Sequence, residues 1–142
     1  MIALDTNLLV YAHRAATSEH RAARAAIERA SQAAAGWGVA APVVAEFWSV
    51  VTHPAASGRP STPDEALAFL MALNAAGAHA WSTGKGFGPR LAQLASDLRV
   101  SGNRVFDLQI ALCAFEGGAS QLWSHDRDFV TIPGLRLVDP LA

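Results

Sequence analysis

The sequence predicts an α/β domain in which a short parallel sheet of four to five strands is flanked by helices. Short apolar runs of strand length alternate with longer segments whose apolar residues recur at helical spacing, and glycines or prolines stand at many of the junctions. The chain has 142 residues, of which 51% are apolar and 16% charged. This length and composition suit a single domain, residues 1–142, with a real hydrophobic core.

The first part of the chain reads as strand, helix, helix, strand. The apolar run at residues 2–4 stops at Asp5 and predicts a short buried strand. Apolar residues on one face predict a helix over residues 6–14. An alanine- and arginine-rich helix is expected from residue 18 or 19 to about residue 36, and a short strand over residues 37–41.

Prolines and a capping motif define the next two helices. Pro42 suits the first turn of a helix, which continues until Pro54 stops it. A loop of glycine, proline and serine follows over residues 55–61. Thr62 and Glu65 then form a capping box around the proline between them, and this predicts a helix that continues to residue 76.

The last part of the chain repeats the alternation of strands and helices. The expected strands cover residues 79–82 and 121–124, with an edge strand at residues 135–138. The expected helices cover residues 89–100 and 105–116. The expected connections are a flexible loop over residues 83–88, a connector over residues 101–104 and a turn over residues 126–129.

Four carboxylates far apart in the chain each interrupt an apolar run: Asp5, Glu46, Asp107 and Asp126, with Asp128 two residues beyond the last. An ionised carboxylate buried alone is costly, so it is paired, hydrogen-bonded or held on a metal. Asp5 and Asp126 directly follow expected strands, and the ligand sites of parallel sheets lie outside the carboxyl ends of the strands. The sequence therefore predicts one acidic pocket at that edge of the sheet.

Each of these acids also has a simpler interpretation. Asp5 is good helix-capping material, and Asp107 suits the first turn of a helix through the macrodipole. Glu46 has the alternative of a solvated surface position, and Asp126 and Asp128 that of an ordinary Asx turn. We favour the pocket because these simpler interpretations require four separate coincidences.

The ligand types indicate Mg²⁺ or Mn²⁺ as the cofactor. Carboxylates without a histidine and cysteine ligand set favour these ions over Zn²⁺, and the five histidines of the chain show no zinc spacing. His125 adjoins the expected pocket and is expected to be exposed or to face a substrate. No Walker loop and no serine-nucleophile motif is present.

The net charge of −1 excludes a global basic field, so an anionic partner must be held by local cations. The candidates for binding such a partner are Lys85, Arg90, Arg104 and Arg127, each of which has surface solubility as an equally good explanation. The single cysteine, Cys113, is expected to be a buried apolar residue. One thiol and the absence of a membrane-length apolar run point to a cytoplasmic protein.

Four short motifs, taken in order, resemble those of a known family. They are Leu-Asp-Thr-Asn at residues 4–7, Val-Ala-Glu-Phe at 44–47, Phe-Asp-Leu-Gln-Ile-Ala at 106–111 and Trp-Ser-His-Asp-Arg-Asp-Phe at 123–129. Together they resemble PIN-domain ribonucleases, and more closely the VapC toxins of toxin–antitoxin pairs. The resemblance covers essentially the whole chain. Leu108 departs from it, since the family usually has a small residue after its third acid.

The resemblance implies a three-layer PIN-like fold and a Mg²⁺- or Mn²⁺-dependent endoribonuclease that acts as a toxin on RNA, such as tRNA. It implies Asp5, Glu46, Asp107 and Asp126 as catalytic, metal-binding acids and Asp128 as an auxiliary fifth. Asn7 and Ser124 would orient the carboxylates. The implied partners are a small VapB-type antitoxin and a second copy of the toxin.

Hydrolysis would then proceed through a water held by the metal, without the RNA 2′-hydroxyl. The main alternative is a catalytically silent protein of the same fold that binds RNA or a partner. An aspartate-nucleophile phosphatase or phosphotransfer domain is a further alternative, disfavoured because Asn7 stands where such enzymes usually have a second early acid.

Overall fold

A parallel sheet of five strands organises the computed structural model, which describes residues 1–56 and 58–142. The strands are β1 (Ile2–Leu4), β2 (Trp37–Ala40), β3 (His79–Trp81), β4 (Gln121–Trp123) and β5 (Arg136–Val138). Their order across the sheet is β3-β2-β1-β4-β5, and every neighbouring pair is parallel. β1 is therefore central, and the residues that follow β1 and β4 lie at the same edge of the sheet.

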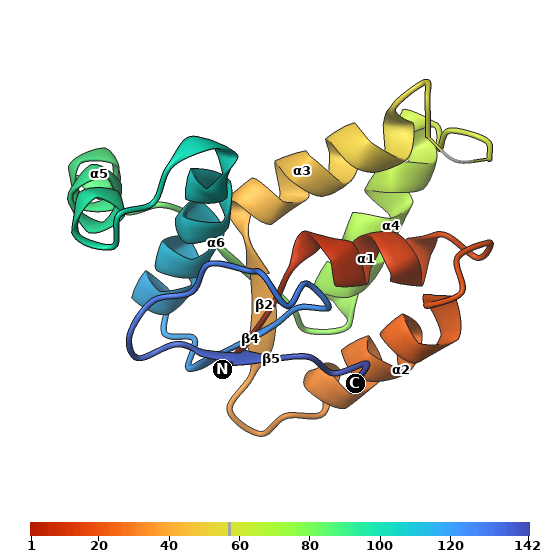
Figure 1. The fold of residues 1–142 in the computed structure, drawn as a ribbon. Helices are drawn as coiled ribbons and strands as arrows, with labels where there is room; N and C mark the ends of the chain where they lie inside the picture. The colour runs from red at the N-terminus through yellow and green to blue at the C-terminus, as the bar shows by residue number, and fades with distance from the viewer. Residues whose placement is uncertain (57) are drawn as a thin grey trace.

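Helices cover both sides of the sheet and produce the expected three-layer arrangement. The helices are α1 (Thr6–His13), α2 (His20–Ser31), α3 (Ala41–Thr52), α4 (Pro63–Ala75), α5 (Phe87–Asp97) and α6 (Val105–Glu116), with a 3₁₀ turn at Gly102–Arg104. In Figure 1, α5 and α6 lie to one side of the strands and α1, α2 and α4 to the other, while α3 extends above them. The predicted α/β class and five-stranded parallel sheet are confirmed.

The element boundaries differ most from the sequence predictions at two helices, and elsewhere by about one residue. α2 ends at Ser31, about five residues earlier than expected, because the chain then turns toward Gly36, which has a φ of 95°. α5 begins at Phe87, two residues before Pro89, because Gly86 adopts a φ of 76° and serves as the N-cap. It ends at Asp97, three residues before the expected end at residue 100, and Arg99 beyond it has a φ of 57°. The capping box of Thr62 and Glu65 is present as predicted, with distances of 3.1 and 3.0 Å.

The core lies against the central strands and holds the inner faces of α1, α3 and α6 in contact. Leu4, Leu8, Phe47, Leu108 and Leu122 are fully buried there. Leu108 thus occupies the core despite its departure from the family pattern. Cys113 is buried as expected, and its Sγ donates to the carbonyl oxygen of Trp81 at 3.3 Å. This packing holds the ends of β1, α3 and α6 in fixed relative positions, which is what a site built from all three requires.

A close backbone approach explains one glycine inside the sheet. A Cβ atom added to Gly38 would lie 2.3 Å from the carbonyl oxygen of His79 on the neighbouring strand. A side chain at this position of β2 would therefore push β3 away. In the part of the chain that the structure describes, no helix has the length and apolarity needed to cross a membrane.

Candidate active site

The four separated acids meet at one cavity. Asp5, Glu46, Asp107 and Asp126 all line a hollow of about 290 Å³, together with Thr6, Asn7, Val10, Tyr11 and Val50. Asp5 follows the central strand β1, and Asp126 lies in the loop after the adjacent strand β4. α3 contributes Glu46 and the first turn of α6 contributes Asp107. The structure thus brings together the acids that the sequence analysis singled out, at the edge of the sheet where they were expected.

Asp5 is the most buried of these acids, with 6% of its surface exposed. Its Oδ1 accepts a hydrogen bond from the backbone N–H of Thr6 at 2.7 Å, and its Oδ2 accepts one from the Ser124 hydroxyl at 2.7 Å. Asp5 is therefore the N-cap of α1 as well as a cavity residue, so both interpretations of it hold. The pKa of Asp5 is raised to about 6, chiefly by burial and further by the charges of Glu46 and Asp107, although its two hydrogen bonds lower it.

The other three acids are more exposed. Burial raises the pKa of Asp107, and the charges of Asp126 and Glu46 add to this rise; its Oδ2 accepts a hydrogen bond from the N–H of Val130 at 3.3 Å. Glu46 and Asp126 are exposed to solvent while facing the cavity. The charges of the neighbouring acids thus raise the pKa of Asp5 and of Asp107, which is the electrostatic signature of a shared acidic site.

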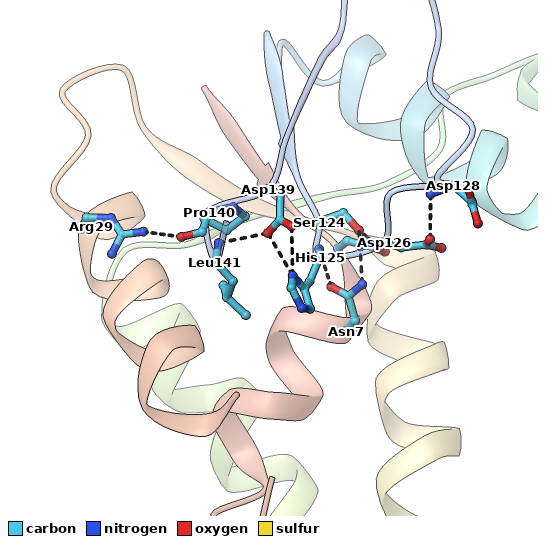
Figure 2. A network of polar contacts seen from close by, with 10 residues as sticks. Asn7, Arg29, Ser124, His125, Asp126, Asp128, Asp139, Pro140 and Leu141 are labelled. Carbon is cyan, nitrogen blue, oxygen red and sulfur yellow. Dashed lines mark hydrogen bonds and ion pairs between the residues drawn. The ribbon is translucent and has the colours of Figure 1, made fainter. Parts of the chain in front are cut away.

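Of the two polar side chains that the family resemblance implied, Ser124 bonds to the acids directly and Asn7 bonds to Ser124. The buried Ser124 hydroxyl donates to Asp5 and accepts from the Asn7 amide at 3.2 Å and from the backbone N–H of Asp126 at 3.0 Å. Figure 2 shows Ser124 and Asn7 side by side between the loop after β4 and the start of α1. Ser124 therefore links the first and last of the four acids through a single oxygen.

Asp128 lies outside the ring of cavity residues. Its backbone N–H donates to Oδ1 of Asp126 at 2.9 Å, which forms the Asx turn considered from the sequence, and its own carboxylate is exposed. Asp128 therefore fixes one oxygen of Asp126 through its backbone.

The donors around the cavity fit a hard divalent cation in chemical type, since they are carboxylate, hydroxyl and amide oxygens. The Thr6 hydroxyl gives independent support: it lines the cavity, and its buried Oγ1 has no hydrogen-bond partner. Within residues 1–56 and 58–142, no three His, Cys, Asp or Glu side chains stand close enough together to form a ready-made ligand set. The cavity therefore gathers suitable ligands without a closed coordination cage.

The four basic candidates divide into two groups. Arg104 and Arg127 are exposed beside the cavity: Arg104 donates to the carbonyl oxygen of Asp128 at 3.3 Å, and Arg127 directly follows Asp126. Arg90 on α5 is occupied, because its guanidinium pairs with Glu116 at 2.6 and 2.8 Å and donates to the carbonyl oxygen of Lys85 at 2.6 Å. None of the four basic candidates lines the cavity itself, and α5, which carries Arg90, lies beyond α6 from α1 (Figure 1).

Sequence reasoning missed one polar contact beside the cavity. His125 was expected to be exposed or to face a substrate, but its ring is half-buried and its Nδ1 lies 3.0 Å from both carboxylate oxygens of Asp139. Asp139 stands just after the edge strand β5. The pairing of β4 with β5 brings these two residues together, so the contact could not be predicted from the sequence near either one.

Comparison with known families defines the class of protein. The family model described as PIN domain matches residues 2–135, which include all four acids. The chain belongs to the PIN-domain family.

Curated relatives narrow this class to the VapC ribonucleases. The chain is 37% identical over 142 residues to VapC ribonuclease Mb2897 of Mycobacterium bovis and to Ribonuclease VapC43 of Mycobacterium tuberculosis, covering 99% of this chain and 96% of each relative. It is 32% identical to Ribonuclease VapC48 of M. tuberculosis over 97% of this chain and 96% of that one. The predicted membership of the VapC group, and with it a nuclease activity, is confirmed.

Solved structures agree with the fold. VapC20 of M. tuberculosis, a toxin that cleaves the Sarcin-Ricin loop, aligns with a TM-score of 0.64 at 14% identity, over 91% of this chain and 92% of that chain. VapBC2 from Rickettsia felis bound to a promoter DNA fragment aligns with a TM-score of 0.68 at 21% identity, over 97% of this chain and 98% of that chain.

Proposed function

We propose that this chain is the toxin of a VapBC-type pair and that it cleaves RNA with Mg²⁺ or Mn²⁺ held by Asp5, Glu46, Asp107 and Asp126. The observation that carries the proposal is the convergence of these acids, from four separate segments, on one cavity of about 290 Å³. The membership of the VapC ribonucleases supports RNA as the substrate. The proposed place of action is the cytoplasm, on structured RNA such as tRNA.

The side chains around the cavity have separate tasks in this proposal. The hydrogen bonds from Thr6 and Ser124 hold both oxygens of Asp5 in place, so that its carboxylate is oriented before the cation arrives. When bound, a divalent cation lowers the pKa of a water molecule and offsets the charge on the phosphate. Asp126 is one of the two solvent-exposed acids of the set, and its Oδ1 is held by the backbone N–H of Asp128, so we assign it to orient the attacking water.

The product ends test this chemistry. Hydrolysis by an external water leaves a 5′-phosphate and does not use the RNA 2′-hydroxyl, so an RNA with a 2′-deoxy substitution at the cleaved position remains a substrate. The assay is cleavage of end-labelled RNA with Mg²⁺, with Mn²⁺ and with a chelator, followed by analysis of the ends. A 2′,3′-cyclic phosphate product, or undiminished cleavage in chelator, would contradict the proposal.

A groove between α2 and α4 is the proposed binding site of a VapB-type antitoxin. It measures about 820 Å³, and Ile27, Trp37, Phe69 and Leu73 give it an apolar floor while charged residues of α2 line its rim. This is the arrangement that an amphipathic helix recognises. Ala25→Arg should block co-purification of the co-expressed antitoxin, because Ala25 lines the groove. The matched control is Ala22→Arg, an exposed α2 position outside the groove lining; equal loss in both variants would argue against this site.

A second copy of the chain is proposed to pack against the face formed by α3 and α6. Phe106 is 56% exposed there and borders a hollow of about 430 Å³ with Pro42 and Ile110. Aromatic side chains are enriched at protein–protein interfaces, and Phe106 borders an apolar hollow into which a partner could pack. Phe106→Ser should shift the mass measured by light scattering from dimer to monomer, whereas Leu67→Ser on α4 should not. A wild-type protein that is monomeric at every concentration would remove the proposal.

A further inference from the structure

The C-terminal segment after β5 returns to the candidate active site. β5 is the parallel neighbour of β4, and the N–H of Ser124 donates to the carbonyl oxygen of Val138 at 2.9 Å. Residues that follow β5 therefore lie beside the loop that follows β4, which carries Ser124 and Asp126. Asp139 is the first residue after β5 and the only acid of the C-terminal segment that follows it.

Asp139 is a fixed hydrogen-bond acceptor for His125. Nδ1 of His125 lies 3.0 Å from each carboxylate oxygen, and the N–H of Leu141 donates to Oδ1 at 2.9 Å. An ionised carboxylate only accepts hydrogen bonds, so Nδ1 of His125 carries a hydrogen. The ring also meets Tyr11 edge-on, with 6.2 Å between ring centres, and Tyr11 lines the acidic cavity. The imidazole is thus held on two sides.

His125 lies between Ser124 and Asp126 in the sequence and is hydrogen-bonded to Asn7. Its backbone N–H donates to Oδ1 of Asn7 at 3.3 Å, and the Asn7 amide donates to Ser124 at 3.2 Å. Ser124 in turn contacts Asp5 and the N–H of Asp126. Figure 2 shows this network as a continuous path from Asp139 through His125, Asn7 and Ser124 to Asp126.

A second contact holds the C-terminal segment after β5, on the side facing α2. Arg29 of α2 donates to the carbonyl oxygen of Pro140 at 3.0 Å, and its guanidinium lies 5.9 Å from the ring centre of Trp123. The same arginine therefore contacts the C-terminal segment and the strand β4 beside it. Figure 2 shows Arg29 at one end of the network and Asp128 at the other.

We propose that Asp139 is a positioning residue of the active site: by holding His125, it fixes the turn of residues 124–126 so that Ser124 and Asp126 keep their places at the cavity. The inference rests on the proposed function. Neither Asp139 nor His125 lines the cavity, so their effect on the reaction is indirect. Small displacements of a metal-binding or water-orienting carboxylate have large effects on the rate of cleavage. They should not change the binding of RNA to exposed basic side chains such as Arg104 and Arg127.

The test combines RNA-cleavage kinetics with a cation titration of the RNA-free protein by calorimetry, using Mn²⁺ as the probe. Asp139→Ala should lower kcat by about tenfold or more, leave KM within about twofold, and weaken Mn²⁺ binding several-fold. Asp139→Asn keeps one acceptor oxygen for His125 and should recover part of both losses. His125→Ala should match Asp139→Ala, and the double variant should add nothing further, because the two residues act as one unit.

Glu65→Gln is the matched control, since it removes the Arg59–Glu65 ion pair remote from the cavity and retains a capping side chain. It should leave kcat and Mn²⁺ binding unchanged. Wild-type values for both Asp139 variants would overturn the inference. The inference would also fail if Asp139→Asn lost cleavage activity only through a higher KM, with kcat and Mn²⁺ binding unchanged. A wild-type protein that neither binds Mn²⁺ nor cleaves RNA would instead overturn the proposed function itself.

Discussion

Replacement of Asp5 by asparagine should make the metal-free protein more stable at pH 7 while it abolishes cleavage. Asp5 is 6% exposed, and its pKa rises from 3.8 to about 6, chiefly because burial penalises the charged form. At about 1.4 kcal/mol for each pKa unit, the ionised side chain costs about 3 kcal/mol of folding free energy at pH 7. Asparagine removes the charge but loses one of the two accepted hydrogen bonds, which costs about 1 kcal/mol.

The net expectation is a gain of about 2 kcal/mol, or on the order of 5–8 °C in Tm for a chain of this size. The dependence on pH follows from the sign of the shift. The folded state holds the proton of Asp5 more tightly than the unfolded state does, so the wild-type free energy of unfolding falls as the pH rises from about 4 to about 6. Below pH 4 Asp5 is protonated in both the folded and the unfolded state, so the wild type no longer bears the cost of a buried charge. Asp5→Asn should then be the less stable protein, because it has lost a hydrogen bond.

Urea unfolding in chelator at pH 7 and at pH 4 measures both effects. Asp128→Asn is the control, because its exposed carboxylate lies outside the cavity and should leave stability nearly unchanged at both pH values. Added Mg²⁺ or Mn²⁺ should then stabilise the wild type and fail to stabilise Asp5→Asn. An Asp5→Asn protein that is less stable than the wild type at pH 7 would refute the reasoning that burial dominates the electrostatics of Asp5.

Three further variants test separate parts of the molecule. Asp107→Asn should abolish metal-dependent cleavage and leave the circular dichroism spectrum unchanged, because Asp107 is only partly buried and its carboxylate accepts a long hydrogen bond, of 3.3 Å, from Val130; retained cleavage would remove it from the catalytic set. Arg127→Ala should weaken RNA binding and reduce the slope of log K against log salt by about 1, and an unchanged slope would exclude a phosphate contact. Gly38→Ala should lower the urea midpoint by the equivalent of about 2 kcal/mol or more, because its Cβ would lie 2.3 Å from the His79 carbonyl oxygen; wild-type stability would show that β3 moves away at little cost.

Elements with local signals were predictable from the sequence. The run at residues 2–4 ends at a carboxylate, and the structure has β1 followed by an N-cap at Asp5. The capping box at Thr62 fixed the start of α4 to the residue. Boundaries without a local signal were less accurate: the end of α2 depends on where the chain turns back to enter β2, and no residue after Ser31 marks that point.

The candidate site was predictable in its members but not in their environments. Each acid interrupts an apolar run, and this alone identified Asp5, Glu46, Asp107 and Asp126. Burial differs sharply among them, since Asp5, at the carboxyl end of the central strand, is buried while Glu46 and Asp126 remain exposed. Sequence neighbours cannot distinguish these cases, because the atoms that exclude water from Asp5 belong to distant segments, such as Ser124.

The sequence by itself was enough to predict the class of fold, four acids that the structure gathers at one cavity, and a hard divalent cation as the ion such ligands suit, because hydrophobic period, capping residues and ligand chemistry are properties of short segments. The tertiary structure decided which charges are free and which are paired. In it, Arg90 forms an ion pair with Glu116, Asp128 lies outside the cavity, and His125 is hydrogen-bonded to Asp139. Such pairings depend on the order of strands in the sheet and on the packing of α5 against α6, and these arise only from contacts between residues far apart in the chain.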